Sequence, residues 1–364
     1  MEKRVQAEHG IIWEMPGEKF GYFGWPSIAR MDDGTLVAAS SGLRTGHIDP
    51  WGKTVINISR DDGKTWTWPR IINDSPIDDR DAGVVSLGGD KLLVTWFTSD
   101  TREYAVEAYA DRFDLKEWQR SLASWTDELV DKWFGSWVIT SDDAGDTWNG
   151  PFRSPVTSPH GPIKLADGDL LYFGKGFTRN RAEGHIMAAR SKDGGKTWNV
   201  VGKVPMYDGT IPDNYHEPHV VELPSGKLVG MIRVERFDPE DKEKGLINFS
   251  MFQTESVDGG KTWSDMKPTG VLGSPPHLIR HSSGVLVCVY GYRAEGYGQR
   301  VLLSKDDGET WENWIIRDDA PNWDLGYPAS VELSDGSIYT IYYQAVAEGR
   351  KCSLLWSRWS LPSL

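Results

Sequence analysis

Short apolar runs follow glycine-containing turns at six places along the chain. Runs such as Leu36–Ser40 and Ile338–Tyr343 come directly after a turn dipeptide, as expected for a strand that leaves a hairpin. The turn glycines are spaced roughly 50 to 80 residues apart, an interval that suits one four-stranded propeller blade. They are Gly34, Gly89, Gly168, Gly226, Gly284 and Gly336. The pattern predicts an all-β fold, a six-bladed β-propeller in which residues 1–364 form a single domain.

The longest interval between these turns holds a segment with a different pattern. Residues from about 103 to 133 space their apolar side chains as a helix does and do not alternate. We expect one or two short helices inserted in a loop of the second blade. Two roles stay open for them, because they can cover apolar surface or form one wall of a ligand pocket.

A second repeat lies between the hairpins. The pattern Ser-x-Asp-x-Gly-x-Thr-Trp occurs five times, starting at Ser59, Ser141, Ser191, Ser256 and Ser304. Ser and Asp side chains accept hydrogen bonds from turn amides, Gly adopts positive φ, and Trp packs its ring beside the turn. These residues therefore predict a stabilised turn and not a catalytic site. The sixth blade lacks a copy, which fits a ring closed by strands from both ends of the chain, Gly10–Glu14 and Ser353–Ser357.

Composition and charge limit the partners of this chain. With 39% hydrophobic residues and a mean hydropathy of -0.47, it is typical of globular proteins, and no apolar run is long enough to span a membrane. The net charge of -13 argues against nucleic acid or an anionic membrane as partner. Cys288 and Cys352 form no metal-ligand pattern, so we expect neither a metal nor a cofactor. The first ten residues lack a secretion signal, which favours the cytoplasm, or secretion of a precursor whose signal peptide is removed.

Titratable side chains gather at one position of the predicted innermost strands. In a propeller these strands line the central channel, so residues at a fixed distance before each hairpin glycine form a ring at its mouth. The ring consists of Trp25, Arg80, Pro159, Glu217, Pro275 and Tyr327, with His160 and His277 beside it. Convergent titratable groups at such a mouth indicate a ligand site.

The octapeptides are Asp boxes, and the chain resembles the sialidase (neuraminidase) superfamily along most of its length. The family's glutamate strand matches residues 216–226, and its tyrosine strand matches residues 326–336. The resemblance implies a six-bladed propeller enzyme. It would be an exo-acting, retaining glycoside hydrolase that releases a terminal sialic acid or a related acidic sugar from a carbohydrate substrate.

The same resemblance implies roles for individual residues. Tyr327 is the nucleophile, Glu217 is the base that takes its proton, and Asp49 is the acid/base. The three cations that hold the substrate's acid group are Arg44, Arg233 and Arg300. A neutral tyrosine suits this chemistry, because the reacting carbon of a sialic acid carries a carboxylate that would repel an anionic nucleophile.

One position departs from the family pattern. Gly24 stands where the first arginine of the carboxylate-binding triad is expected. Arg80 or His47 can replace that arginine, or the substrate carries its acid group elsewhere or has none. Under the last two readings the protein is a hydrolase or lyase for a uronic-acid-containing or neutral polysaccharide, or a binding propeller without catalysis. His160 and His277 are candidates for hydrogen bonds to sugar hydroxyls.

Simpler roles also stay open for the assigned residues. Tyr327 can be a core ring whose hydroxyl finds a partner, and Glu217 can be part of a structural ion pair with a neighbouring histidine. Asp49 can hold a loop turn before Pro50. Three arginines, a glutamate and a tyrosine at family spacing on separate blades are nevertheless hard to explain by structure alone.

Overall fold

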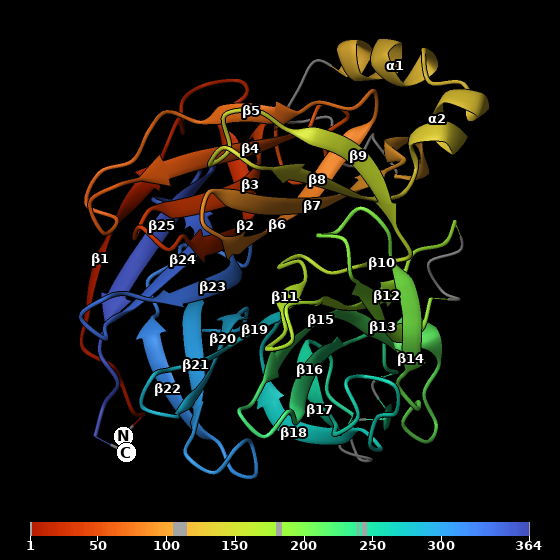
Figure 1. Cartoon of the computed structure of the whole chain (residues 1–364). Coiled ribbons are helices and arrows are strands. Elements are labelled where there is room, and N and C mark those ends of the chain that lie inside the picture. The colour runs from red at the N-terminus through yellow and green to blue at the C-terminus, as the bar shows by residue number, and fades with distance from the viewer. Residues whose placement is uncertain (1, 105–114, 180–183, 239, 242–245, 364) are drawn as a thin grey trace.

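Six antiparallel sheets stand around a common centre in the computed structural model, each forming one blade of a propeller (Figure 1). The structure describes residues 2–104, 115–179, 184–238, 240–241 and 246–363. The predicted all-β, six-bladed fold is confirmed.

Each blade is built from consecutive strands. Blade one contains β2 (Tyr22–Arg30), β3 (Leu36–Arg44), β4 (Lys53–Ser59) and β5 (Arg70–Asn73), and blade two contains β6 (Asp78–Gly88), β7 (Lys91–Ser99), β8 (Ser136–Ser141) and β9 (Asn149–Ser154). Blade three contains β10 (Val156–Thr157), β11 (Ile163–Lys164), β12 (Leu170–Gly176), β13 (Ile186–Ser191) and β14 (Asn199–Lys203). Blade four contains β15 (Tyr215–Glu222), β16 (Leu228–Val234), β17 (Ser250–Ser256) and β18 (Lys267–Leu272). Blade five contains β19 (Pro276–Arg280), β20 (Leu286–Tyr292), β21 (Gly298–Ser304) and β22 (Glu312–Arg317).

The last blade closes the ring. It joins β23 (Gly326–Glu332), β24 (Ile338–Ala345) and β25 (Cys352–Trp359) to β1 (Ala7–Trp13) from the other end of the chain. β1 pairs antiparallel with β25, with Gly10 opposite Trp356. The prediction that strands from both ends complete this blade is therefore confirmed.

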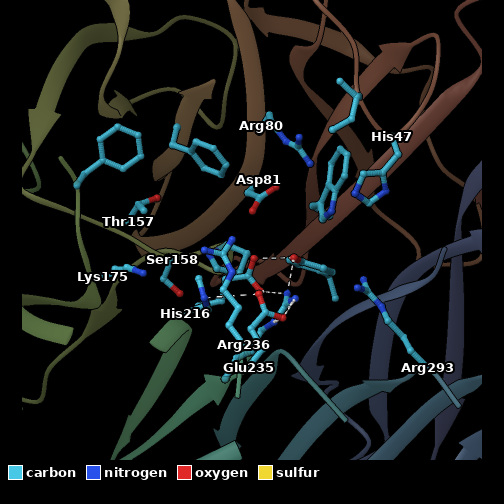
Figure 2. A pocket seen from close by; sticks show the side chains of 18 of the residues that line it. His47, Arg80, Asp81, Thr157, Ser158, Lys175, His216, Glu235, Arg236 and Arg293 are labelled. Carbon is cyan, nitrogen blue, oxygen red and sulfur yellow. Dashed lines mark hydrogen bonds and ion pairs between the residues drawn. The ribbon is translucent and has the colours of Figure 1, made fainter. Parts of the chain in front are cut away.

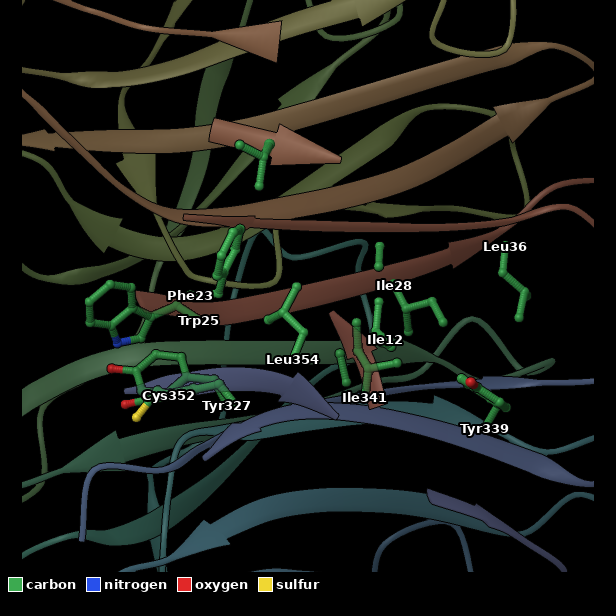
Figure 3. Close-up of a cluster of buried hydrophobic side chains, with 14 of the residues drawn as sticks. Ile12, Phe23, Trp25, Ile28, Leu36, Tyr327, Tyr339, Ile341, Cys352 and Leu354 are labelled. Atoms are coloured by element: carbon green, nitrogen blue, oxygen red, sulfur yellow. The ribbon is translucent and has the colours of Figure 1, made fainter. Parts of the chain in front are cut away.

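The core lies between adjacent blades. The second strands, such as β3 and β24, are buried almost throughout because each sheet packs on both faces against its neighbours. One cluster between blades one and six, which includes Trp25 and Tyr327, is shown in Figure 3. The wall of the channel at these two residues is thus continuous with the core.

The five octapeptide repeats form the turns between the third and fourth strands of blades one to five. In each, the Asp carboxylate accepts hydrogen bonds from the backbone and side chain of the Thr, as Asp61 does from Thr65 at 2.9 and 2.6 Å. The Gly amide donates to the Ser hydroxyl, 2.9 Å from Gly63 to Ser59. The boxes are turn structures, as predicted.

Two helices interrupt blade two between β7 and β8. They are α1 (Leu115–Ala123) and α2 (Asp127–Trp133), and they project from the ring in Figure 1. The helical prediction for the segment is confirmed in its described part, while residues 105–114 lie outside the described ranges. Trp125, Val130 and Phe134 pack with Ile77, so these helices do cover apolar surface. Neither is long and apolar enough to cross a membrane, nor is any other helix that the structure describes.

Candidate active site

A cavity of about 450 Å³ opens at the end of the ring where the first strand of each blade begins (Figure 2). Its volume lies in the range of ligand-binding cavities. All six blades contribute to the wall, including Trp25, Asp81, Pro159, Glu217, Arg293 and Tyr327. The insertion in blade two begins at this same end, and Tyr104 from its first part also lines the cavity.

Tyr327 and Glu217 form a hydrogen-bonded pair in this cavity. They come from β23 and β15, and the Tyr327 hydroxyl donates to Glu217 Oε1 at 2.6 Å. Burial, together with the charge of Glu217, raises the pKa of Tyr327 well above its ordinary value. The phenol is therefore neutral at rest, and Glu217 is placed to receive its proton when the oxygen forms a bond.

Arg233 connects this pair to a second carboxylate. Its Nη1 donates to Glu217 at 2.5 Å and to the Tyr327 hydroxyl at 3.1 Å, and its Nη2 donates to Glu235 at 2.6 Å. Burial alone would lower the pKa of Arg233, but Glu217, Tyr327 and Glu235 hold it raised. A permanent cation beside the phenol stabilises the negative charge that develops when Tyr327 loses its proton.

The same backbone device presents side chains to the cavity in four blades. Trp25, Asp81, Glu217 and Tyr327 have φ values of 51°, 52°, 40° and 50°, and each lies at a register shift in its blade's first strand. A left-handed conformation costs a non-glycine residue about 1–3 kcal/mol and is found preferentially at functional sites. The bulge turns each side chain out of strand alternation and into the channel mouth.

Asp81 and Arg80 are neighbours in β6 and both line the cavity. Asp81 is buried and its Oδ1 has no hydrogen-bond partner among the described residues. Burial raises its pKa to about 7, which Glu217 reinforces and the charge of Arg80 opposes. The guanidinium of Arg80 lies 4.4 Å from the Trp25 ring centre, and its buried Nε likewise lacks a partner in the described chain.

His47 lines the wall beside Trp25. Its Nδ1 lies 2.8 Å from Asp324 Oδ1, a carboxylate that Tyr22 and Tyr343 also contact. Burial lowers the pKa of His47, and the hydrogen bond to Asp324 only partly offsets this. A neutral His47 with its Nδ1 held in this way keeps Nε2 as a hydrogen-bond acceptor.

Arg293 approaches the reactive pair from blade five. Its guanidinium lies 5.7 Å from the Tyr327 ring centre, and its Nε and Nη2 donate to the Leu325 carbonyl at 3.0 and 2.8 Å. Together with Arg80 and Arg233 it brings three cations to the neighbourhood of Tyr327. An acidic protein with a local basic wall suits an acidic ligand, although the wall also carries carboxylates.

Three residues expected at the site point elsewhere. Arg44 is fully buried and forms a two-pronged ion pair with Asp78, at 2.6 and 3.0 Å. Arg300 lies over the Tyr292 ring at 3.8 Å and bonds to Glu2. Asp49 is fully buried in its loop, where its carboxylate accepts hydrogen bonds from Thr45 and Trp51. The side-chain directions of these residues follow from local partners that sequence motifs do not encode.

His160 and His277 lie beneath the cavity wall. They form a buried cluster with His219 at ring-centre separations of 4.4 to 5.8 Å. Nδ1 of His219 accepts a hydrogen bond from the Leu278 amide and Nδ1 of His277 from the Ser330 amide, so both neutral rings carry their proton on Nε2. Such nitrogens do not ligate a metal, and no three-residue metal-binding group is found within the described ranges. Pro275, also placed in the ring by counting, does not line the cavity either.

Asp81 and Arg293 are two of the cavity residues that escaped the sequence assignment. Counting from the hairpin glycine missed Asp81 by one position because Gly89 stands one place earlier in its turn than Gly34 does: Ser86 pairs with Leu92 as Arg30 pairs with Leu36, so Asp90 occupies the place of Gly34. Arg293 directly follows β20, a second strand, as Arg233 lies near the end of β16. The recurrence of a basic residue at the end of a second strand is a signal that could have identified Arg293.

Comparison with known proteins agrees with this architecture. A model of the BNR repeat-like domain matches residues 113–340. A sialidase from Bacteroides fragilis is 24% identical over 355 residues, which cover 88% of this chain and 60% of that protein. The chain thus spans about three fifths of the length of this relative.

Two solved structures have the same fold. A Dyadobacter fermentans protein of unknown function superposes with a TM-score of 0.78 at 22% identity, covering 98% of this chain and 99% of the other. The intramolecular trans-sialidase of Ruminococcus gnavus, bound to oseltamivir carboxylate, gives a TM-score of 0.67 at 16% identity, with 97% of both chains covered.

Proposed function

Because this chain belongs to the BNR repeat-like family and has the sialidase propeller fold, we propose that it is an exo-acting, retaining glycoside hydrolase for an acidic sugar. The observation that carries the proposal is the hydrogen bond of 2.6 Å between Tyr327 and Glu217 inside the cavity. A purely structural tyrosine would not require a carboxylate partner, a cation at 3.1 Å and a strained backbone together.

The chemistry begins at the tyrosine. Tyr327 Oη attacks the anomeric carbon while its proton passes to Glu217, and Arg233 stabilises the charge on the phenolic oxygen. The covalent glycosyl intermediate is then hydrolysed by water, so two displacements give net retention of configuration. Tyrosine nucleophiles of sialidases are a known exception to the usual carboxylate pair of retaining glycosidases.

The acid group of the substrate is assigned to Arg80 and Arg293. Of the three arginines suggested by resemblance, only Arg233 lies in the wall, and two carboxylates already hold it. Arg80 is a buried cation whose Nε has no hydrogen-bond partner among the described residues, an arrangement that a substrate anion would compensate. A terminal sialic acid is the first candidate substrate.

A glycoside of a uronic acid is the second candidate. Trp25 contacts both Arg80 and Tyr327: the Arg80 guanidinium lies 4.4 Å from its ring centre, and the Tyr327 ring centre lies 6.4 Å from it. An acid group held by Arg80 alone would therefore stand away from the carbon that Tyr327 attacks. In a uronic acid the carboxylate is remote from the anomeric carbon in this way.

Hydrolysis of aryl glycosides tests the proposal. We would measure fluorescence release from the 4-methylumbelliferyl glycosides of N-acetylneuraminic acid and of glucuronic acid, with Tyr327→Phe as the control. Turnover of either substrate that the variant lacks supports the glycosidase, and the preferred substrate identifies the sugar. If the folded wild-type protein cleaves neither, or if Tyr327→Phe remains active, the proposal fails.

A further inference from the structure

The proposed reaction needs a proton donor that the Tyr327–Glu217 pair does not supply. The donor must reach the leaving oxygen from the cavity wall, away from the nucleophile, and must exchange its proton near neutral pH. Asp49 does not meet the first condition. Its carboxylate is fully buried within the loop, where Thr45 and Trp51 donate to it, and it does not line the cavity.

Asp81 occupies the position in blade two that the reactive pair occupies in blades four and six. Its φ of 52° matches the 40° of Glu217 and the 50° of Tyr327, and all three stand at a bulge of the first strand. The fold thus holds three titratable side chains in one strained conformation around one cavity. Figure 2 shows Asp81 beside Arg80 in the cavity wall, and its charge acts on Tyr327 as that of Glu217 acts on Asp81.

The surroundings of Asp81 leave its carboxyl group available. Its Oδ1 is buried without a hydrogen-bond partner among the described residues, unlike the saturated carboxylate of Asp49. The charged or titratable groups that act on it come from four blades and are Arg44, Arg80, Glu217, Arg233 and Tyr327. Burial, the largest of these influences, raises its pKa to about 7, so both protonation states are accessible at neutral pH.

We propose that Asp81 is the acid/base of the reaction, a role that rests on the proposed function. In the first step Tyr327 Oη bonds to the anomeric carbon and Glu217 takes the phenol proton. The glycosidic C–O bond breaks, and the Asp81 proton goes to the leaving oxygen, giving an alcohol. In the second step Asp81 removes a proton from water, whose oxygen bonds to the anomeric carbon. The bond to Tyr327 breaks, and Glu217 returns the proton to the phenolate.

His47 is the rival for this role. It also lines the cavity, and its Nε2 is free to exchange a proton while Asp324 holds Nδ1. Burial lowers the pKa of His47, which leaves Nε2 without a proton to donate near neutral pH, and its ring centre lies 5.0 Å from that of Trp25. The two candidates make different predictions when each is replaced separately.

Leaving-group dependence decides between them. Asp81→Asn, His47→Asn and Asp49→Asn would be compared on aryl glycosides and on the methyl glycoside of the sugar that the wild type cleaves. A proton donor is needed most when the leaving group is poor. The rate of the first, bond-breaking step should therefore fall roughly 10²- to 10⁴-fold in Asp81→Asn with the methyl glycoside. With the 2,4-dinitrophenyl glycoside the same rate should fall far less. Azide, which needs no base, should restore turnover of the dinitrophenyl glycoside and yield the glycosyl azide. The basic limb of the wild-type profile of kcat/KM against pH should disappear.

The controls separate this proposal from the proposed function. If Asp81→Asn slows the cleavage of the methyl and the dinitrophenyl glycosides equally, Asp81 is not the acid. The same conclusion follows if His47→Asn is the variant that slows only the cleavage of the methyl glycoside. If Asp49→Asn slows only the cleavage of the methyl glycoside, Asp49 is the acid/base. Asp81→Gly, which suits a φ of 52°, keeps the fold if asparagine does not and should give the same dependence. A wild-type protein without glycosidase activity would remove both proposals, whereas an active one with an inactive Tyr327→Phe leaves only the acid in question.

Discussion

Asp81 at the cavity end of the blades and the aspartates of the octapeptide turns at the other end have opposite environments. At the end with the third-to-fourth strand turns, Asp143, Asp258 and Asp306 each accept bonds from a threonine, which lowers their pKa values to about 2. At the cavity end, Asp81 is buried, its Oδ1 has no hydrogen-bond partner in the part of the chain that the structure describes, and burial raises its pKa to about 7. The carboxylates of the repeated aspartates are saturated by their own turns, whereas Asp81 keeps an oxygen that no described residue contacts.

Among substitutions at the two ends of the blades, the largest effect on activity is expected at Tyr327, at the cavity end. Tyr327→Phe removes the nucleophilic oxygen and should lower kcat by about 10³-fold or more, because the covalent route is lost. The thermal unfolding midpoint should stay close to that of the wild type, since the ring that packs in the core is retained. Steady-state kinetics and circular dichroism on the same preparation check both parts. Loss of the folded state together with activity would place Tyr327 among the structural residues.

Arg80 should show a binding effect without a stability cost. Arg80→Met should reduce kcat/KM for the acidic glycoside roughly 10- to 100-fold, the value of a charged hydrogen-bonded contact, and should leave a neutral analogue of the sugar unchanged. Arg44→Met is the matched control. It breaks a buried ion pair with Asp78 and should destabilise the fold instead, by about 3–5 kcal/mol. Equal losses on acidic and neutral substrates in Arg80→Met would contradict the anion-binding role.

Replacing Gly63, the glycine of the first octapeptide repeat, should reduce stability and leave activity unchanged, the reverse of the effect expected for Arg80. Gly63 has a φ of +81°, and an added Cβ would meet the Tyr339 ring at 2.4 Å. Gly63→Ala should therefore lower the free energy of unfolding by about 3 kcal/mol. Denaturant titration measures this loss, and kcat per folded molecule should not change. Gly168, whose Cβ would contact nothing within 4 Å, is the control for the conformational part of the cost.

The smallest effect concerns pH. A pKa of about 2 for Asp143 lies below the unfolded value, so its ionised form contributes stability above about pH 4, and this contribution is lost as the pH falls toward 2. Thr147→Val removes one donor to this carboxylate and should lower the unfolding midpoint at pH 7 by about 1–2 °C. The difference between variant and wild type should shrink below pH 4. A constant difference from pH 7 to pH 2 would mean that the hydroxyl acts by packing.

The fold could be predicted from the sequence because its information is local and repeated. The hairpin glycines and the octapeptides recur in every blade or nearly so, and an error in one copy is corrected by the others. Glu217 and Tyr327 could be predicted for the same reason, since they stand at the same distance before their hairpins.

The rest of the site depends on features that do not repeat. The glycine of the blade-two turn stands one place earlier than in the other turns, so counting back from it pointed to Arg80 in place of Asp81, although both side chains reach the cavity. The direction of Arg44 depends on Asp78, and that of Arg300 on Tyr292 and Glu2, partners that no motif includes. Motif spacing locates a residue on a strand, but the partners of its side chain decide which way it faces.

The pairing of β1 with β25 has a consequence for biosynthesis. Synthesis makes β1 before every other strand of the propeller, and the sheet gives it no neighbour until β25, the last strand of the same blade, follows. The edge of β1 is exposed to wrong pairing throughout translation, so chaperone dependence and aggregation should concentrate in nascent chains that end before residue 352. Tyr327 belongs to the same late blade, so the hydrogen-bonded pair of Tyr327 and Glu217 cannot form before the ring is nearly complete.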